Sequence, residues 1–121
     1  MTKKILVVDD EAEIVMLLER ALKAKGYEVI TAPEGREALN QVKLHHPDLI
    51  VSDLMMPDLD GWRLSHKLRE NELHKKIPIL LLSAIVSKDG PADDLEVGDY
   101  YIAKPFDMEK LLGKIKELLN E

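Results

Sequence analysis

The chain has 121 residues, of which 45% are hydrophobic, 23 acidic and 17 basic, and its net charge is −6. These values predict one globular domain over residues 1–121 and argue against a nonspecific nucleic-acid binder, which needs a basic surface. No cysteine is present and no apolar run approaches about 20 residues, so we expect neither a disulfide scaffold nor a membrane span, and a cytoplasmic protein by default.

The first third of the chain alternates between strand-like and helix-like segments. Residues 4–8 end in the apolar run ILVV, which is typical of a parallel strand covered on both faces. Residues 11–25 carry apolar side chains at helical spacing, Gly26 predicts the end of that helix, and residues 27–31 predict a second strand. The apolar positions of the helix are Ile14, Leu17, Leu18, Ala21 and Leu22.

The middle of the chain repeats this alternation. Residues 35–45 predict a helix that Pro47 ends, and residues 48–52 predict a third strand. After a loop of turn-forming residues, a further helix is expected over residues 62–73. The basic residues 74–76 are expected to form a solvated helix end. The expected buried positions of the 62–73 helix are Leu64, Leu68 and Leu73.

The last third contains the most apolar segment. Residues 77–83, IPILLLS, predict a fourth strand, and residues 91–97 predict a short helix with a proline in its first turn. A fifth strand is expected over residues 100–103. The final helix is expected over residues 107–119, and Gly113 in its interior weakens it.

Five predicted strands thus alternate with five predicted helices. This order is typical of an α/β protein in which right-handed crossovers build a parallel sheet with helices on both faces. In such sheets ligands bind beyond the carboxyl ends of the strands, where the strand order reverses. The candidate functional residues are therefore those that follow the strands.

Charged and hydroxyl side chains follow four of the five predicted strands: Asp9 and Asp10, Asp53, Ser83, and Lys104. Carboxylates about 4 Å apart repel by about 4 kcal/mol at an effective dielectric constant near 20. A shared proton or a cation must offset this repulsion. Because the candidate ligands are oxygens, the cation is expected to be Mg²⁺, or Mn²⁺ in its place. Divalent cation, lysine, hydroxyl and carboxylate are the groups that phosphoryl transfer requires.

Each of these residues also has a purely structural interpretation. An aspartate after a strand is commonly a helix N-cap or a turn residue, and this applies to Asp9 and Asp10 taken singly. The segment MMPDLDG could be only a turn, and Lys104 only a surface lysine. The structural interpretation would have to hold at four strand ends together, which favours a functional site.

The chain resembles the receiver domains of bacterial two-component response regulators over essentially its whole length. The resemblance rests on ILVVDDE at residues 5–11, DLIVSDLMMPDLDGW at 48–62, LLSA at 81–84 and YIAKPFD at 101–107. It implies a flavodoxin-like, doubly wound fold with strand order 2-1-3-4-5 and five flanking helices. Each motif alone is moderately specific, but their order and spacing together are strongly specific.

The resemblance implies a role for each acidic residue at the strand ends. Asp53 matches the phosphoacceptor, which receives a phosphoryl group from a phosphohistidine of a histidine kinase. Asp10 matches a direct Mg²⁺ ligand, and Asp9 its partner, often through water. Asp53 and the backbone carbonyl of Met55 would complete the ligands that the protein supplies.

The same resemblance implies a conformational switch. Lys104 would form an ion pair with the phosphoryl oxygens, and its peptide bond to Pro105 would be cis. Ser83 would move to bond the phosphoryl group, and Tyr101 would follow by turning its ring inward. The change would reach the face formed by the 91–97 helix, the fifth strand and the last helix.

The expected function is a phosphorylation-activated signalling switch that catalyses its own phosphotransfer and slow autodephosphorylation. Its expected partners are a sensor histidine kinase or phosphotransfer protein and a downstream protein or a missing effector domain. We expect no contact of this domain with nucleic acid or membrane, and a monomer that can dimerise when phosphorylated. Two alternatives are an aspartyl-phosphate hydrolase of the haloacid dehalogenase type, which requires an aspartate where Met55 stands, and a receiver-like binding module that is not phosphorylated.

Overall fold

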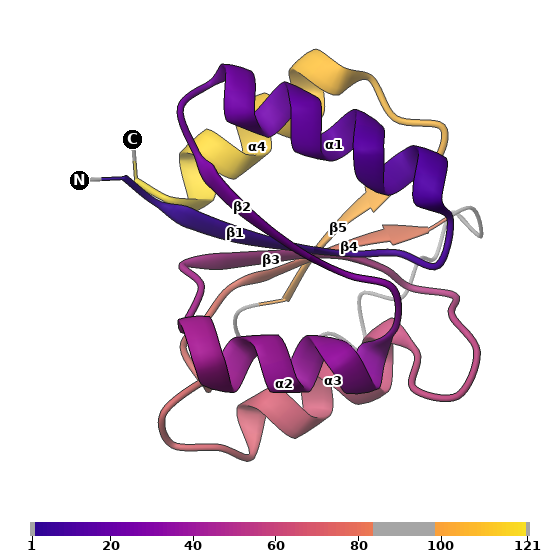
Figure 1. The fold of residues 1–121 in the computed structure, drawn as a ribbon, viewed down its shortest axis with the longest axis vertical. Helices are drawn as coiled ribbons and strands as arrows, with labels where there is room; N and C mark the ends of the chain where they lie inside the picture. The colour runs from indigo at the N-terminus through magenta and orange to yellow at the C-terminus, as the bar shows by residue number, and fades with distance from the viewer. Residues whose placement is uncertain (1, 84–98, 121) are drawn as a thin grey trace.

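A computed structural model of the chain describes residues 2–83 and 99–120. Five parallel strands form one sheet in the order β2-β1-β3-β4-β5, which confirms the predicted topology (Figure 1). The elements in chain order are β1 (Lys4–Val8), α1 (Ala12–Ala24), β2 (Glu28–Ala32), α2 (Gly35–His45), β3 (Leu49–Asp53), α3 (Gly61–Arg69), β4 (Ile79–Ser83), β5 (Asp99–Ala103) and α4 (Met108–Leu118).

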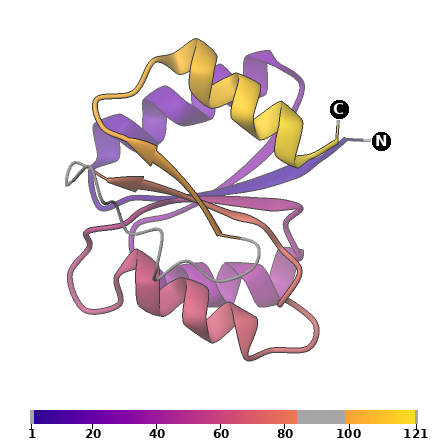
Figure 2. The same ribbon diagram turned by 180° about the vertical axis from the view of Figure 1, so that it is seen from behind.

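The sheet is the middle layer of three. Helices α1 and α4 cover one face and α2 and α3 cover the other, as both views show (Figures 1 and 2). Alternate side chains of β1 enter different cores: Ile5 packs beneath α1 and α4, whereas Leu6 packs beneath α2 and α3. Because both faces are covered, β3 and β4 are buried along their whole length, as expected for inner parallel strands.

Helix ends follow the capping chemistry of the sequence. Gly26 has φ +91, a conformation that L side chains rarely adopt. It follows the C-cap of α1, so the helix ends at the predicted glycine. The carboxylates of Glu34, Asp60 and Asp107 each accept a backbone N–H in the first turn of α2, α3 and α4. Among the helices of residues 2–83 and 99–120, none is long and apolar enough to cross a lipid bilayer.

The predicted helix over residues 91–97 lies outside the described residues and stays a prediction, and four helices are described. Two other expectations differ from the structure. Helix α3 ends at Arg69, and Leu73 is 79% exposed, not buried as predicted. The chain turns at Asn71, whose side chain accepts the backbone N–H of Leu73. This turn buries His74, which was expected to be solvated.

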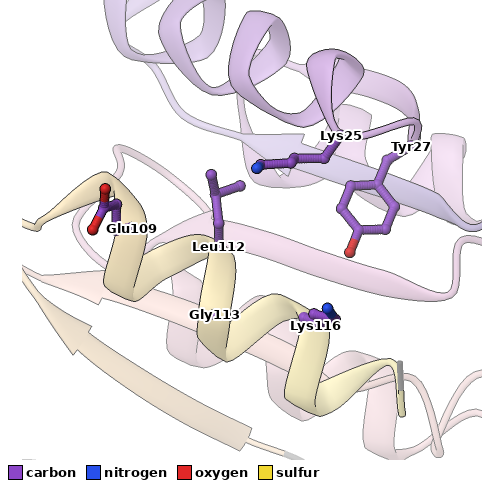
Figure 3. Close-up of a pocket in the computed structure, with 6 residues that line it drawn as sticks. All are labelled: Lys25, Tyr27, Glu109, Leu112, Gly113 and Lys116. Carbon is purple, nitrogen blue, oxygen red and sulfur yellow. The ribbon is translucent and has the colours of Figure 1, made fainter.

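Gly113, in the interior of α4, offers a test of the fold. It lines a hollow between α4 and the end of α1 (Figure 3), and a Cβ placed there would meet nothing within 4 Å. We expect Gly113→Ala to raise the free energy of unfolding by about 0.5–1 kcal/mol, because alanine restricts the unfolded chain and favours the helix. Urea unfolding of both proteins measures the change.

Gly35 supplies the matched control. A Cβ at this first residue of α2 would lie 2.8 Å from the Cβ of Leu59 and would also clash with the Leu59 carbonyl oxygen. We therefore expect Gly35→Ala to lower the free energy of unfolding by roughly 1–3 kcal/mol. Similar changes in the two variants would contradict the packing described here.

Candidate functional site

The strand register brings two aspartates together. Strands β1 and β3 are neighbours, and Val8 pairs with Ser52. The next residues along the two strands are Asp9 and Asp53, which are 2% and 5% exposed. Two carboxylates thus lie side by side and largely buried at the carboxyl edge of the sheet.

Four acidic residues gather at this edge, which we call the acidic cluster: Asp9, Asp10, Glu11 and Asp53. One carboxylate oxygen from each lies within 4.8 Å of the others. Asp10 and Glu11 are exposed, so the cluster opens to solvent on one side. Glu11 was not among the predicted metal ligands, although its place as the third acid of the DDE run was a usable signal.

Lys104 supplies the positive charge that faces the acidic cluster. Its Nζ lies 3.5 Å from Asp9 Oδ2 and 3.5 Å from Asp53 Oδ1, so one ammonium bridges both carboxylates. The backbone N–H of Lys104 donates to the Ser83 carbonyl at 2.7 Å, which fixes the residue beside the end of β4. The Lys104–Pro105 peptide bond is cis, as predicted.

The electrostatics of the site disfavour charge on Asp9. Burial raises the pKa of the Asp9 carboxyl, and repulsion from Asp53 adds to this rise. The Glu11 backbone N–H and Lys104 lower the Asp9 pKa, but only in part. For Lys104, burial acts to lower the pKa of its ammonium, but attraction to Asp9 and Asp53 outweighs burial, and the pKa is raised. Lys104 alone does not neutralise the acidic cluster.

The ligand atoms of the acidic cluster fit a hard divalent cation. All four side chains offer carboxylate oxygens, the ligands that Mg²⁺ and Mn²⁺ prefer. Within the described residues, no imidazole joins this group of ligand atoms. The two exposed acids leave room for water, which Mg²⁺ retains when it binds proteins.

The loop after Asp53 is held by α2 and by the start of α3. The backbone N–H of Met55 donates to Asp53 Oδ1 at 3.3 Å, while the Met55 side chain is 56% exposed. Arg36 of α2 pairs with Asp58, a loop residue with φ +67. A Cβ at Gly61 would approach the Asp53 carbonyl oxygen to 2.9 Å, so the helix can lie this close only with glycine there. None of these contacts was predicted from the sequence.

The two predicted switch residues flank the site. Ser83 ends β4 and is fully buried. Tyr101 lies on β5, is partly buried and packs against the core beneath α2 and α3. Parallel pairing of β4 and β5 places Ser83 opposite Ala103, two residues after Tyr101. Ser83 therefore ends β4 beside Lys104, and Tyr101 lies on the edge strand β5, which leads into Lys104.

A hollow of about 330 Å³ adjoins the acidic cluster between α1 and the segment that follows β2. Its lining residues are Asp9, Asp10, Ala12, Val15, Met16, Glu19, Thr31, Ala32 and Pro33. The hollow of about 490 Å³ in Figure 3 is larger, but no acid of the cluster lines it. Of these two hollows, the smaller one reaches the acidic cluster, through Asp9 and Asp10.

Asp9→Asn is expected to stabilise the metal-free protein by roughly 1 kcal/mol, because it removes a buried charge that its surroundings disfavour. Asparagine can still accept the Glu11 N–H, which donates to Asp9 Oδ1 at 2.9 Å. Because the Asp9 pKa is raised, wild-type protein gains stability as the pH falls through this pKa, so the stability difference between Asp9→Asn and wild type should shrink in acid. Thermal unfolding of both proteins in the presence of a chelator measures this difference.

Asp10→Asn is the control for this prediction, because Asp10 is exposed and its charge is hydrated. Asp10→Asn should change the stability of the metal-free protein less than Asp9→Asn does. Added Mg²⁺ should reverse the order, with wild-type protein stabilised more than Asp9→Asn. An Asp9→Asn protein less stable than wild type without metal would show that Asp9 is not repelled in the folded state.

Known proteins resemble this chain in sequence and structure. A family profile described as response regulator receiver domain matches residues 5–116. The chain is 45% identical over 121 residues to the alkaline phosphatase synthesis transcriptional regulatory protein PhoP of Bacillus subtilis (strain 168), covering 99% of this chain and 50% of that protein. It is 41% identical over 118 residues to the transcriptional regulatory protein PrrA of Mycobacterium bovis, covering 97% of this chain and 50% of that protein.

Solved structures also resemble this chain over nearly its whole length. Chemotaxis protein CheY4 of Vibrio cholerae matches with a TM-score of 0.89 and 32% identity, covering 98% of this chain and 99% of that one. A CheY-like receiver domain protein from Methanospirillum hungatei JF-1 also matches with a TM-score of 0.89, at 30% identity, covering 99% of this chain and 95% of that one. This chain spans about half the length of the curated relatives named above, and nearly all of these structures.

Proposed function

This chain belongs to the response regulator receiver domain family, and on that basis we propose that it is a phosphorylation-activated signalling switch whose acceptor is Asp53. One observation supports the assignment most directly: Lys104 lies 3.5 Å from both Asp9 and Asp53, within a group of acids from separate strands. We further propose that residues 1–121 act as one receiver unit.

The free oxygen of Asp53 is the proposed nucleophile. Asp53 Oδ1 accepts the Met55 N–H and pairs with Lys104, whereas no hydrogen bond to Oδ2 occurs among the described residues. Oδ2 would attack the phosphorus of a phosphohistidine. A phosphorus–oxygen bond forms as the phosphorus–nitrogen bond breaks, and the imidazole takes the bonding electron pair and a proton. The product is an acyl phosphate on Asp53.

Charge is the main obstacle, because the phosphoryl group brings about two negative charges to carboxylates. A bound Mg²⁺ would supply positive charge at the transferring oxygens. We propose that Asp9, Asp10 and Asp53 hold this ion, together with the backbone carbonyl of Met55. Lys104 would then exchange its contact with Asp53 Oδ1 for one with a phosphoryl oxygen.

Ser83 and Tyr101 are the proposed readout. Ser83, at the end of β4, would donate its hydroxyl to the new phosphoryl group. Tyr101, already partly buried against the core, would then turn farther inward and change the surface of β5 and α4. The 91–97 segment would form part of the same surface, but it lies outside the described residues.

The hollow beside Asp9 and Asp10 is the proposed docking place of the phosphodonor. Met16 and Leu17 of α1 are 52% and 51% exposed, and Met16 lines the hollow. Exposed apolar side chains on the helix that borders Asp9 and Asp10 suit a helix of a histidine kinase or phosphotransfer protein that carries the phosphohistidine.

The output is a separate proposal. The two curated relatives are transcriptional regulators about twice as long as the region matched, so the switch would act on an effector domain or a separate partner. We propose no nucleic-acid or membrane contact through this domain, a cytoplasmic location, and a monomer that can dimerise once phosphorylated.

The decisive experiment uses acetyl phosphate as the phosphodonor. We expect intact mass spectrometry to show one added phosphoryl group with Mg²⁺, and none when a chelator removes the ion. The adduct should be lost in base, as an acyl phosphate is. Trp62 lies in the first turn of α3, directly after the loop that follows Asp53, so its fluorescence offers a second readout of Mg²⁺ binding. Labelling independent of Mg²⁺, or stable in base, would contradict the proposal.

A haloacid-dehalogenase-type hydrolase is not favoured. Such enzymes use a second aspartate two residues after the nucleophile, and that position is Met55, with an exposed apolar side chain. Family membership also supports the receiver function over an unphosphorylated binding module, because the acids and the lysine of the site are all present.

A further inference from the structure

His74 is a buried residue with an unsatisfied ring nitrogen. It lies between α3 and β4 and is only 4% exposed. Its Nε2 is buried and, within the described part of the chain, has no hydrogen-bond partner. A buried polar atom without a partner costs about 1–3 kcal/mol, so its presence calls for a physical explanation.

A second imidazole lies next to it. His46 follows the last residue of α2, is exposed, and has φ +47. The ring centroids of His46 and His74 are 5.6 Å apart, and the ring planes are inclined by 40°. The two residues are far apart in sequence and meet because α2 and α3 pack on the same face of the sheet.

We propose that His46 and His74 form a site for a divalent transition-metal ion of borderline softness, such as Zn²⁺, Ni²⁺ or Cu²⁺. Imidazole nitrogens prefer these ions to Mg²⁺. The site would be separate from the acidic cluster, which offers only oxygens. It would join the end of α2 to the segment that leads into β4.

The distance between the rings supports a shared ion. With metal–nitrogen bonds of about 2.0–2.1 Å and tetrahedral angles, two ligating imidazoles have ring centres about 5 Å apart. The observed separation of 5.6 Å is close to this value. The tilted rings are not stacked, which is compatible with nitrogens directed at a common point.

The charge state of His74 is also suitable. Burial lowers the pKa of the His74 imidazole, and repulsion from His46 and Lys43 lowers it further, which favours the neutral ring that can offer a lone pair to a metal. The cleft that His74 lines contains Lys43 and Lys67 but also the acids Glu70 and Glu72. Because His46 is exposed, solvent on its side of the site can complete the coordination.

The test is a Zn²⁺ titration of the whole chain by calorimetry, with excess Mg²⁺ to occupy the acidic cluster. The key variant is His46→Asn, because asparagine tolerates a left-handed backbone and so preserves the end of α2. We expect at least a tenfold loss of Zn²⁺ affinity at one site. His66→Gln is the matched control: His66 is exposed, pairs with Glu70 at 3.2 Å, and should leave the affinity unchanged.

Cu²⁺ provides an independent readout, because electron paramagnetic resonance detects nitrogen ligands directly. We expect two nitrogens in wild-type protein and one or none in His46→Asn. His74→Gln should behave like His46→Asn if it folds. Equal Zn²⁺ affinity of wild type and His46→Asn in the presence of Mg²⁺, or no nitrogen signal with Cu²⁺, would overturn the proposal.

Discussion

Asp53→Asn is expected to abolish phosphorylation by acetyl phosphate and by a histidine kinase. Asparagine keeps an oxygen that can accept the Met55 N–H, so the loop after β3 should retain its position. It lacks a charged oxygen able to attack phosphorus, so the new bond cannot form. Mass spectrometry after incubation with Mg²⁺ and acetyl phosphate should show no adduct, and circular dichroism should show an intact fold.

Asp58→Asn is the matched control. Asp58 lies on the same loop and carries the same carboxylate, but it is exposed and bonded to Arg36. Its phosphorylation should match that of wild-type protein to within a fewfold. If Asp53→Asn were labelled as fully as wild type, the acceptor would have to be another residue.

Asp10→Asn is expected to weaken Mg²⁺ binding at least tenfold, or about 1.4 kcal/mol. The variant removes one charged ligand from a group whose oxygens lie within 4.8 Å of one another. An unscreened interaction between the Asp10 charge and the ion at this range would contribute more than this to the binding free energy. Asp10 is exposed, however, so water screens the interaction. Trp62 fluorescence measures affinity, and the Mg²⁺ concentration that gives half-maximal labelling should rise in parallel.

Lys104→Ala should change Mg²⁺ affinity in the opposite direction. Its ammonium competes with the ion for Asp9 and Asp53, so its removal should tighten Mg²⁺ binding severalfold. Phosphorylation should nevertheless slow, because no lysine then meets the phosphoryl oxygens. Weaker Mg²⁺ binding in Lys104→Ala would mean that Lys104 positions the acids and does not compete for them.

The sheet and the acidic cluster could be predicted because both depend on local patterns and on topology. Buried parallel strands require continuous apolar runs, and their carboxyl ends share one edge, so Asp9 and Asp53 had to meet once β1 and β3 were neighbours. The expectation of oxygen ligands for a hard cation followed from residue type. Lys104 entered the same prediction because it directly follows β5.

Features that depend on long-range packing could not be predicted. The periodicity of α3 extends to Leu73, but the helix ends at Arg69, and the turn at Asn71 buries His74 in place of Leu73. Leu17 fits the apolar pattern of α1 and is nevertheless 51% exposed. In both cases the helical pattern was real, but the position of the helix against its neighbours decided which side chains are buried.

The contact between α2 and the loop after Asp53 limits how this site can be engineered. Gly35 packs against Leu59 and Arg36 holds Asp58, although these residues are far apart in sequence. A designer who grafts only the 53–61 segment onto another scaffold would leave its backbone unsupported. A graft must also include the start of α2, so the smallest set of residues that can be transferred consists of two segments that are separate in the sequence.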